Sequence, residues 1–203
     1  MNKVTLAMTG ASGAPYTLRL MQELLKSGVQ IQFICSQPGQ IVIAMESDLK
    51  LQSSPQQMQA QLCEYFSCDA QQLQVYGKDQ WTAPVASGSS VSDAMVVCPC
   101  SMGSLAAIAH GLSNNLIHRA ADVIIKERRK LILVPRETPL SSLHLENMLR
   151  LSNLGAVILP PNPGFYQGVN CVDDLVDFVV SRILDQLNID NQLSPRWSNT
   201  EES

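Results

Sequence analysis

Short apolar runs alternate with helical patterns along most of this chain. Val4 to Met8 is a β-prone run that ends at a glycine-rich turn, after which apolar residues recur at helical spacing up to Gly28. Val29 to Cys35 alternates apolar and polar positions, as a strand does. Further strands, each beside a helical pattern, are expected at Ala94–Cys98, Leu131–Val134 and Ala156–Leu159. Strands separated by helices predict an α/β fold with one doubly wound parallel sheet in a three-layer sandwich.

Two further regions, one internal and one at the C-terminal end, complete the predicted organisation of the chain. Residues 49–80 are polar and rich in glutamine, with one possible amphipathic helix around Met58–Tyr65, so we interpret them as a peripheral excursion. Val172 to Leu187 carries one apolar stripe and predicts a terminal helix. We therefore expect a single domain over residues 1–190 and a tail over residues 191–203, in which Trp197 is an unusual residue to leave in solvent.

Composition and charge narrow the class of protein. Of the 203 residues, 45% are hydrophobic and 16% are charged, which is typical of a globular domain. A net charge of −4 offers no global positive field, so neither nucleic acid nor an anionic membrane is an expected partner. The longest apolar runs fall short of the ~20 residues that cross a bilayer, and the N-terminus resembles no signal peptide. A cytoplasmic protein is expected.

The cysteines and histidines do not suggest a metal centre. Six cysteines in a chain of this length are expected to remain thiols and to pack as small apolar residues. The spacing of Cys98-Pro99-Cys100 is too short for a zinc motif, and no second ligand pair accompanies it, so no metal is predicted. The three histidines show no partner pattern for a nucleophilic triad.

Two loops that follow predicted strands carry hydroxyl groups and glycine. Gly10-Ala11-Ser12-Gly13 precedes a helix, whose N-terminal N–H groups and dipole favour a phosphate. The loop from Cys98 to Leu105 repeats the pattern with Ser101 and Ser104. Two such loops at the carboxyl ends of strands favour a phosphorylated cofactor. An ordinary turn and a plain N-cap remain the alternatives.

Charged residues supply two further candidates. Arg119, Asp122 and Lys126 share one helical face, which binds an anion or is simply solvated. Arg136 and Glu137 follow a strand, where a guanidinium can fork a phosphate and a carboxylate can take a proton.

Glu46 and an aromatic loop complete the candidate site. Glu46 stands in apolar company, where burial raises the pKa of a carboxyl and makes it a candidate proton shuttle; the alternative is an exposed helical glutamate. The stiff loop Pro160–Tyr166 either forms a wall over a ligand or merely ends the strand before it.

In order, and over nearly the whole chain to Trp197, these segments resemble the UbiX-like flavin prenyltransferases, a flavoprotein family long labelled aromatic acid decarboxylases. The resemblance rests on segments 9–14, 98–101, 119–129, 134–140, 155–161, 164–166 and the helix 172–187. Many members of that family carry a lysine-threonine pair where this chain has Gly103-Ser104.

The resemblance implies a flavodoxin-like, Rossmann-like fold and a metal-independent prenyltransferase. Such an enzyme joins the dimethylallyl group of dimethylallyl monophosphate to N5 and C6 of reduced FMN and releases phosphate. The product, prenylated FMN, serves a UbiD-like decarboxylase, often in ubiquinone biosynthesis. The resemblance also implies a homododecamer with sites between subunits, against which the tail would pack.

Carried onto this chain, the resemblance assigns three sets of residues. FMN is held by Gly10, Ala11, Ser12, Ser36, Ser101, Met102, Gly103, Ser104 and Arg136. The prenyl phosphate is surrounded by Arg119, Lys126, Glu137, Tyr166 and Arg182. The catalytic residues are Ser12 and Glu46, which manage protons at flavin N5, and Glu137 near the leaving phosphate.

The sequence leaves three rival functions open. One is a flavoprotein decarboxylase of related fold that acts on a peptidyl cysteine and uses a histidine near the flavin, where this chain offers Ser12. Another is direct decarboxylation of an aromatic acid. The third is an FMN carrier, for which the two hydroxyl loops suffice but the cationic residues are superfluous.

Overall fold

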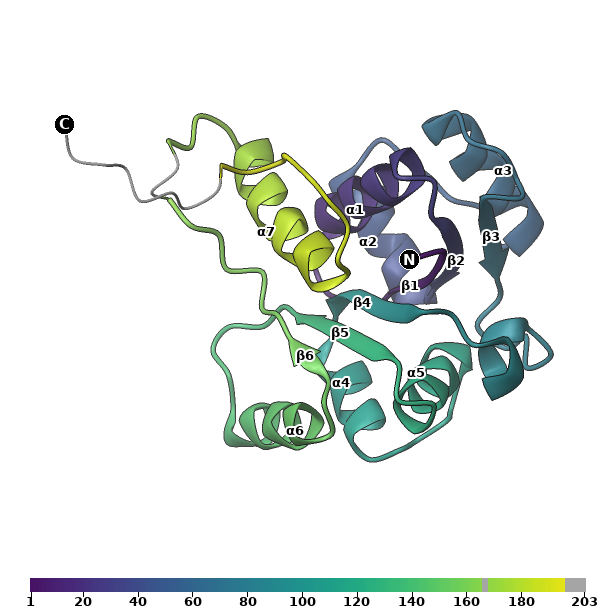
Figure 1. Cartoon of the computed structure of the whole chain (residues 1–203), viewed down its shortest axis with the longest axis vertical. Helices are drawn as coiled ribbons and strands as arrows, with labels where there is room; N and C mark the ends of the chain where they lie inside the picture. Colours follow the sequence, from purple (N-terminus) through teal and green to yellow (C-terminus); the bar gives the residue numbers. More distant parts are fainter. Residues whose placement is uncertain (166–167, 196–203) are drawn as a thin grey trace.

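One six-stranded sheet organises the chain in a computed structural model, which describes residues 1–165 and 168–195. All its neighbouring strands run parallel, in the order β3-β2-β1-β4-β5-β6 (Figure 1). The strands are β1 Lys3–Met8, β2 Gln30–Cys35, β3 Leu73–Tyr76, β4 Ala94–Cys100, β5 Lys130–Pro135 and β6 Val157–Ile158. The predicted doubly wound parallel sheet is confirmed.

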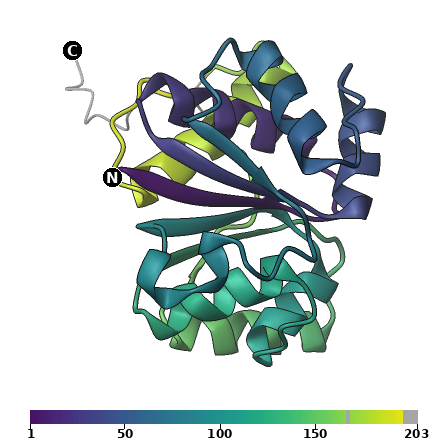
Figure 2. The same cartoon turned by 90° about the vertical axis from the view of Figure 1, so that its right-hand side faces the viewer.

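Helices cover both faces of the twisted sheet, so the molecule has three layers (Figure 2). The apolar side chains of α1, α2, α3 and α7 pack in one core and those of α4, α5 and α6 in the other. The helices are α1 Ala14–Lys26, α2 Gln37–Glu46, α3 Pro55–Phe66, α4 Met102–Ala109, α5 Leu116–Lys126, α6 Ser142–Asn153 and α7 Val172–Gln186, with short 3-10 turns η1 Pro84–Ala86 and η2 Gly88–Ser90.

Strand β1 shows why the central strands read as apolar runs. Val4, Leu6 and Met8 pack into the core under α1, whereas Ala7 packs into the core on the opposite face. A strand covered on both sides buries successive residues. From β1 the chain winds outward to β2 and β3, then returns to β4 and winds the other way. The winding direction therefore changes between β1 and β4.

The region of residues 49–80 is more than a peripheral excursion. It contains β3, which pairs with β2 through Ile31↔Leu73 and Phe33↔Val75 and forms one edge of the sheet. Leu73 and Val75 are buried, but this four-residue strand also carries an exposed Gln74. Only two residues of β3, Leu73 and Val75, point into the core. An alternation this short cannot be distinguished from the surrounding polar sequence.

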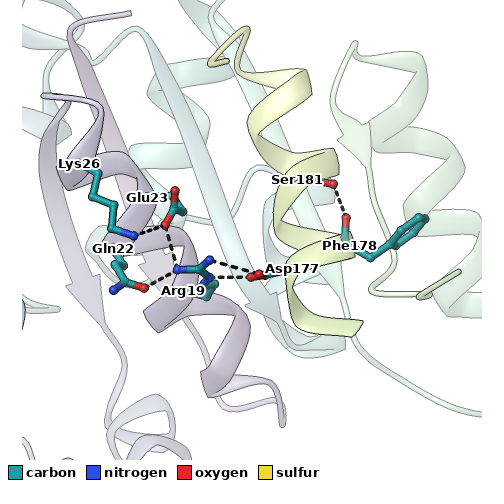
Figure 3. A network of polar contacts seen from close by, with 7 residues as sticks. All are labelled: Arg19, Gln22, Glu23, Lys26, Asp177, Phe178 and Ser181. Atoms are coloured by element: carbon teal, nitrogen blue, oxygen red, sulfur yellow. Dashed lines mark hydrogen bonds and ion pairs between the residues drawn. The ribbon is translucent and has the colours of Figure 1, made fainter. Parts of the chain in front are cut away.

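The terminal helix α7 is anchored to α1 by an arginine. Arg19 Nε donates to Asp177 Oδ1 at 2.6 Å and Nη2 donates to Asp177 Oδ2 at 3.2 Å (Figure 3). Nη1 of the same guanidinium donates to Gln22 Oε1 at 2.6 Å and to Glu23 Oε1 at 2.9 Å. The fork fixes α7 against α1 beside the apolar contacts of that core.

After α7 the chain packs against the same core that α7 covers. Leu193 packs against the core under α1, and Asn191 donates to Asp185 Oδ1 at 3.2 Å. Residues 196–203, including Trp197, lie outside the described residues. Within the described part, no helix is both long and apolar enough to cross a membrane, and no three His, Cys, Asp or Glu side chains gather as metal ligands.

Candidate active site

The candidate site lies at the carboxyl edge of the sheet, around the change of winding direction. Ser12 follows β1, Ser36 follows β2, Ser101 follows β4 and Arg136 follows β5. Because all these strands are parallel, their carboxyl ends share one edge. Open α/β sheets bind ligands at this position. The fold thus gathers residues that are far apart in the chain.

Glu46, at the end of α2, binds the N-terminus of α1. Its Oε2 accepts hydrogen bonds from the backbone N–H groups of Gly13 and Ala14, each at 2.8 Å. Gly13 has φ of 134°, which a glycine adopts without strain. The Ser12 side chain also hydrogen-bonds to Glu46. The anion at this helix terminus is therefore the chain's own carboxylate, and the Gly13 and Ala14 N–H groups are already occupied.

The expected rise in the pKa of Glu46 is wrong. Burial does raise its pKa, but hydrogen bonds from Ser12, Gly13 and Ala14 and the positive charge of Arg136 lower the pKa further than burial raises it. The pKa of Glu46 consequently falls below its ordinary value of 4.5. Glu46 is a carboxylate at neutral pH, so it is equipped to accept a proton or to orient the Ser12 hydroxyl.

Arg136 is fixed through its backbone, while its side chain keeps a hydrogen-bond donor without a partner among the described residues. Its backbone N–H donates to Cys100 O at 3.3 Å, which ties the loop after β5 to the end of β4. The side-chain Nε is buried and, among the described residues, has no hydrogen-bond partner. Leaving such a group unpaired costs free energy. An anionic or carbonyl oxygen of a bound flavin fits this donor.

The serines of the second and third loops cap their own helices. Ser36 Oγ accepts from Gly39 N at 3.0 Å at the start of α2, and Ser101 Oγ accepts from Ser104 N at 3.4 Å at the start of α4. The N-cap alternative considered for the loop after β4 is thus realised at Ser101, and Ser36 caps α2 in the same way. The Ser101 hydroxyl also donates to Ser104 Oγ at 3.2 Å, so any flavin contact of this pair falls to the Ser104 O–H, whereas Ser36 accepts one hydrogen bond and keeps its O–H donor.

Thr9, which the sequence analysis did not single out, joins the two central loops. Its Oγ1 donates to Pro99 O at 2.9 Å and accepts from Ser101 N at 2.7 Å. Thr9 is buried and comes directly before the glycine turn. Its position at a strand end was the available signal, but the partner 90 residues away is visible only in the fold.

Two site glycines face different surroundings. A Cβ on Gly10 would lie 2.4 Å from Pro38 Cβ, so the first loop can pack against α2 only with glycine there. A Cβ on Gly103 would meet nothing within 4 Å. The first turn of α4 therefore has free space beside Gly103.

The cationic residues assigned to the prenyl phosphate do not meet within one chain. Arg119 and Lys126 lie on α5, whereas Arg182 lies on α7 across the sheet (Figure 1). Lys126 ends α5 just before β5 begins, so it lies at the amino edge, opposite Ser12. Each pairs with a neighbour: Arg119 with Asp122 at 3.0 Å, Lys126 with Glu127, and Arg182 with Asp185 at 2.7 Å.

The last two predicted residues are Glu137 and Tyr166. Glu137 is exposed, and its Oε1 accepts from Thr138 N at 3.2 Å, next to Arg136 at the carboxyl edge. Tyr166 lies outside the described residues.

Comparison with known proteins identifies the class. The chain matches the Flavoprotein family over residues 1–184. It is 58% identical over 195 residues to the flavin prenyltransferase UbiX of Pseudomonas aeruginosa, covering 96% of this chain and 93% of that one. It is 47% identical over 193 residues to the flavin prenyltransferase UbiX of Halalkalibacterium halodurans, covering 95% and 92%. The chain belongs to the UbiX-like flavin prenyltransferases within the flavoproteins.

Solved structures agree with this assignment. AnUbiX (PadA1), in complex with FMN and dimethylallyl pyrophosphate, superposes with a TM-score of 0.87 at 40% identity, covering 98% of this chain and 99% of that one. A dodecameric FMN-dependent UbiX-like decarboxylase from Escherichia coli O157:H7 gives 0.85 at 39% identity, covering 97% and 100%. The expected flavodoxin-like fold is confirmed.

Proposed function

We propose that this chain joins the dimethylallyl group of dimethylallyl monophosphate to N5 and C6 of reduced FMN and releases phosphate. The observation that carries the proposal is the cluster of Ser12, Glu46 and Arg136 at the carboxyl edge of the sheet. It stands in a chain 58% identical to a flavin prenyltransferase. Reduced FMN supplies the nucleophilic ring atoms, and the protein binds, orients and moves protons.

The cluster assigns a role to each of its members. Glu46 is charged and hydrogen-bonded to Ser12. The pair can therefore accept a proton from flavin N5 and pass it from the Ser12 hydroxyl to the Glu46 carboxylate. Arg136, whose buried Nε has no partner in the described part of the chain, would hold a flavin oxygen. Gly10, Ala11, Ser36 and the Ser101–Ser104 loop would line the flavin, with Glu137 beside Arg136.

We further propose that the prenyl-phosphate site forms between subunits of a homo-oligomer. Arg119 and Lys126 lie on the opposite sheet face from Arg182, so a single chain cannot bring them to one phosphate. Phosphate departure needs fixed positive charge where negative charge develops. A relative of 39% identity is dodecameric, which supports a dodecamer here.

Exposed leucines on α6 favour the same assembly. Leu143 is 67% exposed and Leu149 is 62% exposed, which leaves an apolar surface on this helix for another subunit. Of the tail expected over residues 191–203, Leu193 packs on its own subunit, so the residues after it, together with Tyr166, are the ones proposed to reach a neighbouring subunit. The product is proposed to serve a UbiD-like decarboxylase in the cytoplasm, with ubiquinone biosynthesis as the pathway.

The test is anaerobic incubation of the purified protein with reduced FMN and dimethylallyl monophosphate, followed by mass spectrometry of the released flavin. We expect a gain of one five-carbon prenyl unit. An unmodified flavin that stays bound would instead identify an FMN carrier. Parallel reactions with dimethylallyl diphosphate would establish which phosphate is accepted.

Two variants separate chemistry from folding in this assay. Glu46→Gln removes the carboxylate but preserves the size of the side chain, so we expect FMN binding to persist while prenylation slows. Glu64→Gln makes the same change at an exposed position on α3 and should leave turnover unaltered. Unchanged turnover in Glu46→Gln would remove Glu46 from the mechanism.

A further inference from the structure

Two cysteines meet where α3 ends, and one of them, Cys68, lines the same groove as Glu46. After Phe66 the chain turns through Ser67 in the left-handed conformation, with φ of 52°. Cys68 N donates to Cys63 O at 3.0 Å, and Ser67 N donates to Glu64 O at 3.2 Å. These two hydrogen bonds define a Schellman motif, the usual left-handed end of a helix.

The motif brings the two cysteine side chains together. In such a motif the two residues that are five positions apart, here Cys63 and Cys68, place their side chains in contact, commonly as an apolar pair. Here both are cysteines, and their thiols hydrogen-bond to each other. Both are free and half-buried against the core under α1.

We propose that Cys63 and Cys68 are a modification site that forms a reversible intrachain disulfide when the protein meets hydrogen peroxide. In the first step the Cys68 thiolate attacks the peroxide, giving a sulfenic acid and hydroxide. In the second the Cys63 sulfur attacks that sulfur, forming the S–S bond and releasing water. The sum is two thiols and one peroxide going to one disulfide and two waters.

Access decides which thiol reacts first. Cys68 lines an open groove of about 1000 Å³ together with Phe66 and Asp69, whereas Cys63 does not line it. Burial, with the adjacent Cys68, raises the pKa of Cys63 to about 11, so Cys63 is protonated at neutral pH. Cys68 is therefore the attacking thiol and Cys63 the resolving one.

The other closely spaced cysteines lack this arrangement. Cys98 and Cys100 stand two residues apart, yet Cys98 packs into the core under α1 and Cys100 into the core on the opposite face. Both are fully buried, which excludes peroxide. Cys171 is exposed and stands at the start of α7, so it serves as an internal control for simple oxidation.

The sequence supplies a clean assay. Trypsin cuts after Lys50 and Lys78, and the peptide 51–78 contains Cys63 and Cys68 but no other cysteine. The reduced full-length protein is treated with hydrogen peroxide, unfolded, labelled with N-ethylmaleimide and digested. We expect this peptide to lack two hydrogen atoms and to carry no label. After reduction with dithiothreitol and a second treatment with N-ethylmaleimide, it should carry two labels. Met58 oxidation in the same peptide adds oxygen and is distinguishable.

Single variants test the assigned order. In Cys63→Ser, Cys68 should accumulate as a sulfenic acid that dimedone traps, whereas in Cys68→Ser, Cys63 should take much less dimedone. A peptide 51–78 that keeps both labels while Cys171 is oxidised would overturn the proposal. So would pairing of either cysteine with a different one. Because the main readout uses the unmodified chain, a variant that fails to fold does not affect it.

Discussion

Glu46 Oε2 accepts a hydrogen bond from Gly13 N at 2.8 Å, so the end of α2 holds the start of α1. The same oxygen accepts from Ala14 N, and the Ser12 side chain completes the set. A carboxylate at a helix N-terminus is stabilised by the amides and by the helix dipole. One side chain thereby supports the fold and presents a charged group beside the proposed flavin position.

Replacing Glu46 by glutamine should weaken the fold in a pH-dependent way. We expect Glu46→Gln to lower the free energy of unfolding by about 1 kcal/mol near neutral pH, because the dipole loses its anion. The pKa of Glu46 is lowered in the folded state, so its stabilisation is complete above the ordinary value of 4.5 and disappears as the pH falls through the lowered pKa. Urea unfolding near neutral pH and in acid measures this. An equal deficit at both pH values would contradict it.

Replacement by alanine should have opposite effects on stability at Gly10 and at Gly103. Gly10→Ala places a methyl group 2.4 Å from Pro38 Cβ, and we expect a loss of ~1–3 kcal/mol, typical of overpacking. Gly103→Ala meets nothing within 4 Å and lies in α4, so the protein should gain up to ~1 kcal/mol. Thermal unfolding of the two variants is the measurement. A Gly10→Ala protein as stable as the wild type would show that α2 moves aside at little cost.

Arg182 should matter for the prenyl phosphate and little for FMN. We expect Arg182→Ala to weaken binding of dimethylallyl monophosphate about tenfold, because a charged hydrogen bond contributes about 1.5 kcal/mol. Titrations of each ligand separate the two effects. Arg150→Ala, at an exposed position on α6, is the matched control. Equal loss of both ligands in Arg182→Ala would indicate a folding defect instead.

The Arg19–Asp177 fork should couple α1 to α7 measurably. Their side chains are 27% and 24% exposed, so solvent screens the pair only in part. A double-mutant cycle with Arg19→Gln and Asp177→Asn should give a coupling of about 0.5–1 kcal/mol in urea unfolding. The pair Lys78–Asp79, 3.8 Å apart and 53% and 70% exposed, should give a coupling indistinguishable from zero. Equal couplings would mean that the fork does not secure α7.

The pattern of apolar residues was sufficient for most of the sheet but not for its edge. β1 and β4 are buried on both faces, and such runs are visible in a sequence because nearly every residue is apolar, with Lys3 and Thr5 of β1 as the exceptions. β3 was missed because two buried residues among glutamines carry no distinct period. The serines at the strand ends could be predicted as site residues from the strand positions alone. Parallel strands bring their carboxyl ends to one edge of the sheet regardless of the details of packing.

By itself, the sequence determined the parallel α/β fold, the family and the loops that carry the candidate site, because periodicity and ordered motifs are properties of the chain. Only the tertiary structure decided the charge state of Glu46, since a pKa depends on burial, amides and a guanidinium that come from separate elements. It also placed Arg119 and Arg182 on opposite faces of the sheet. The contact of Cys63 with Cys68 likewise depends on the left-handed turn at Ser67, which no pattern of apolar residues records.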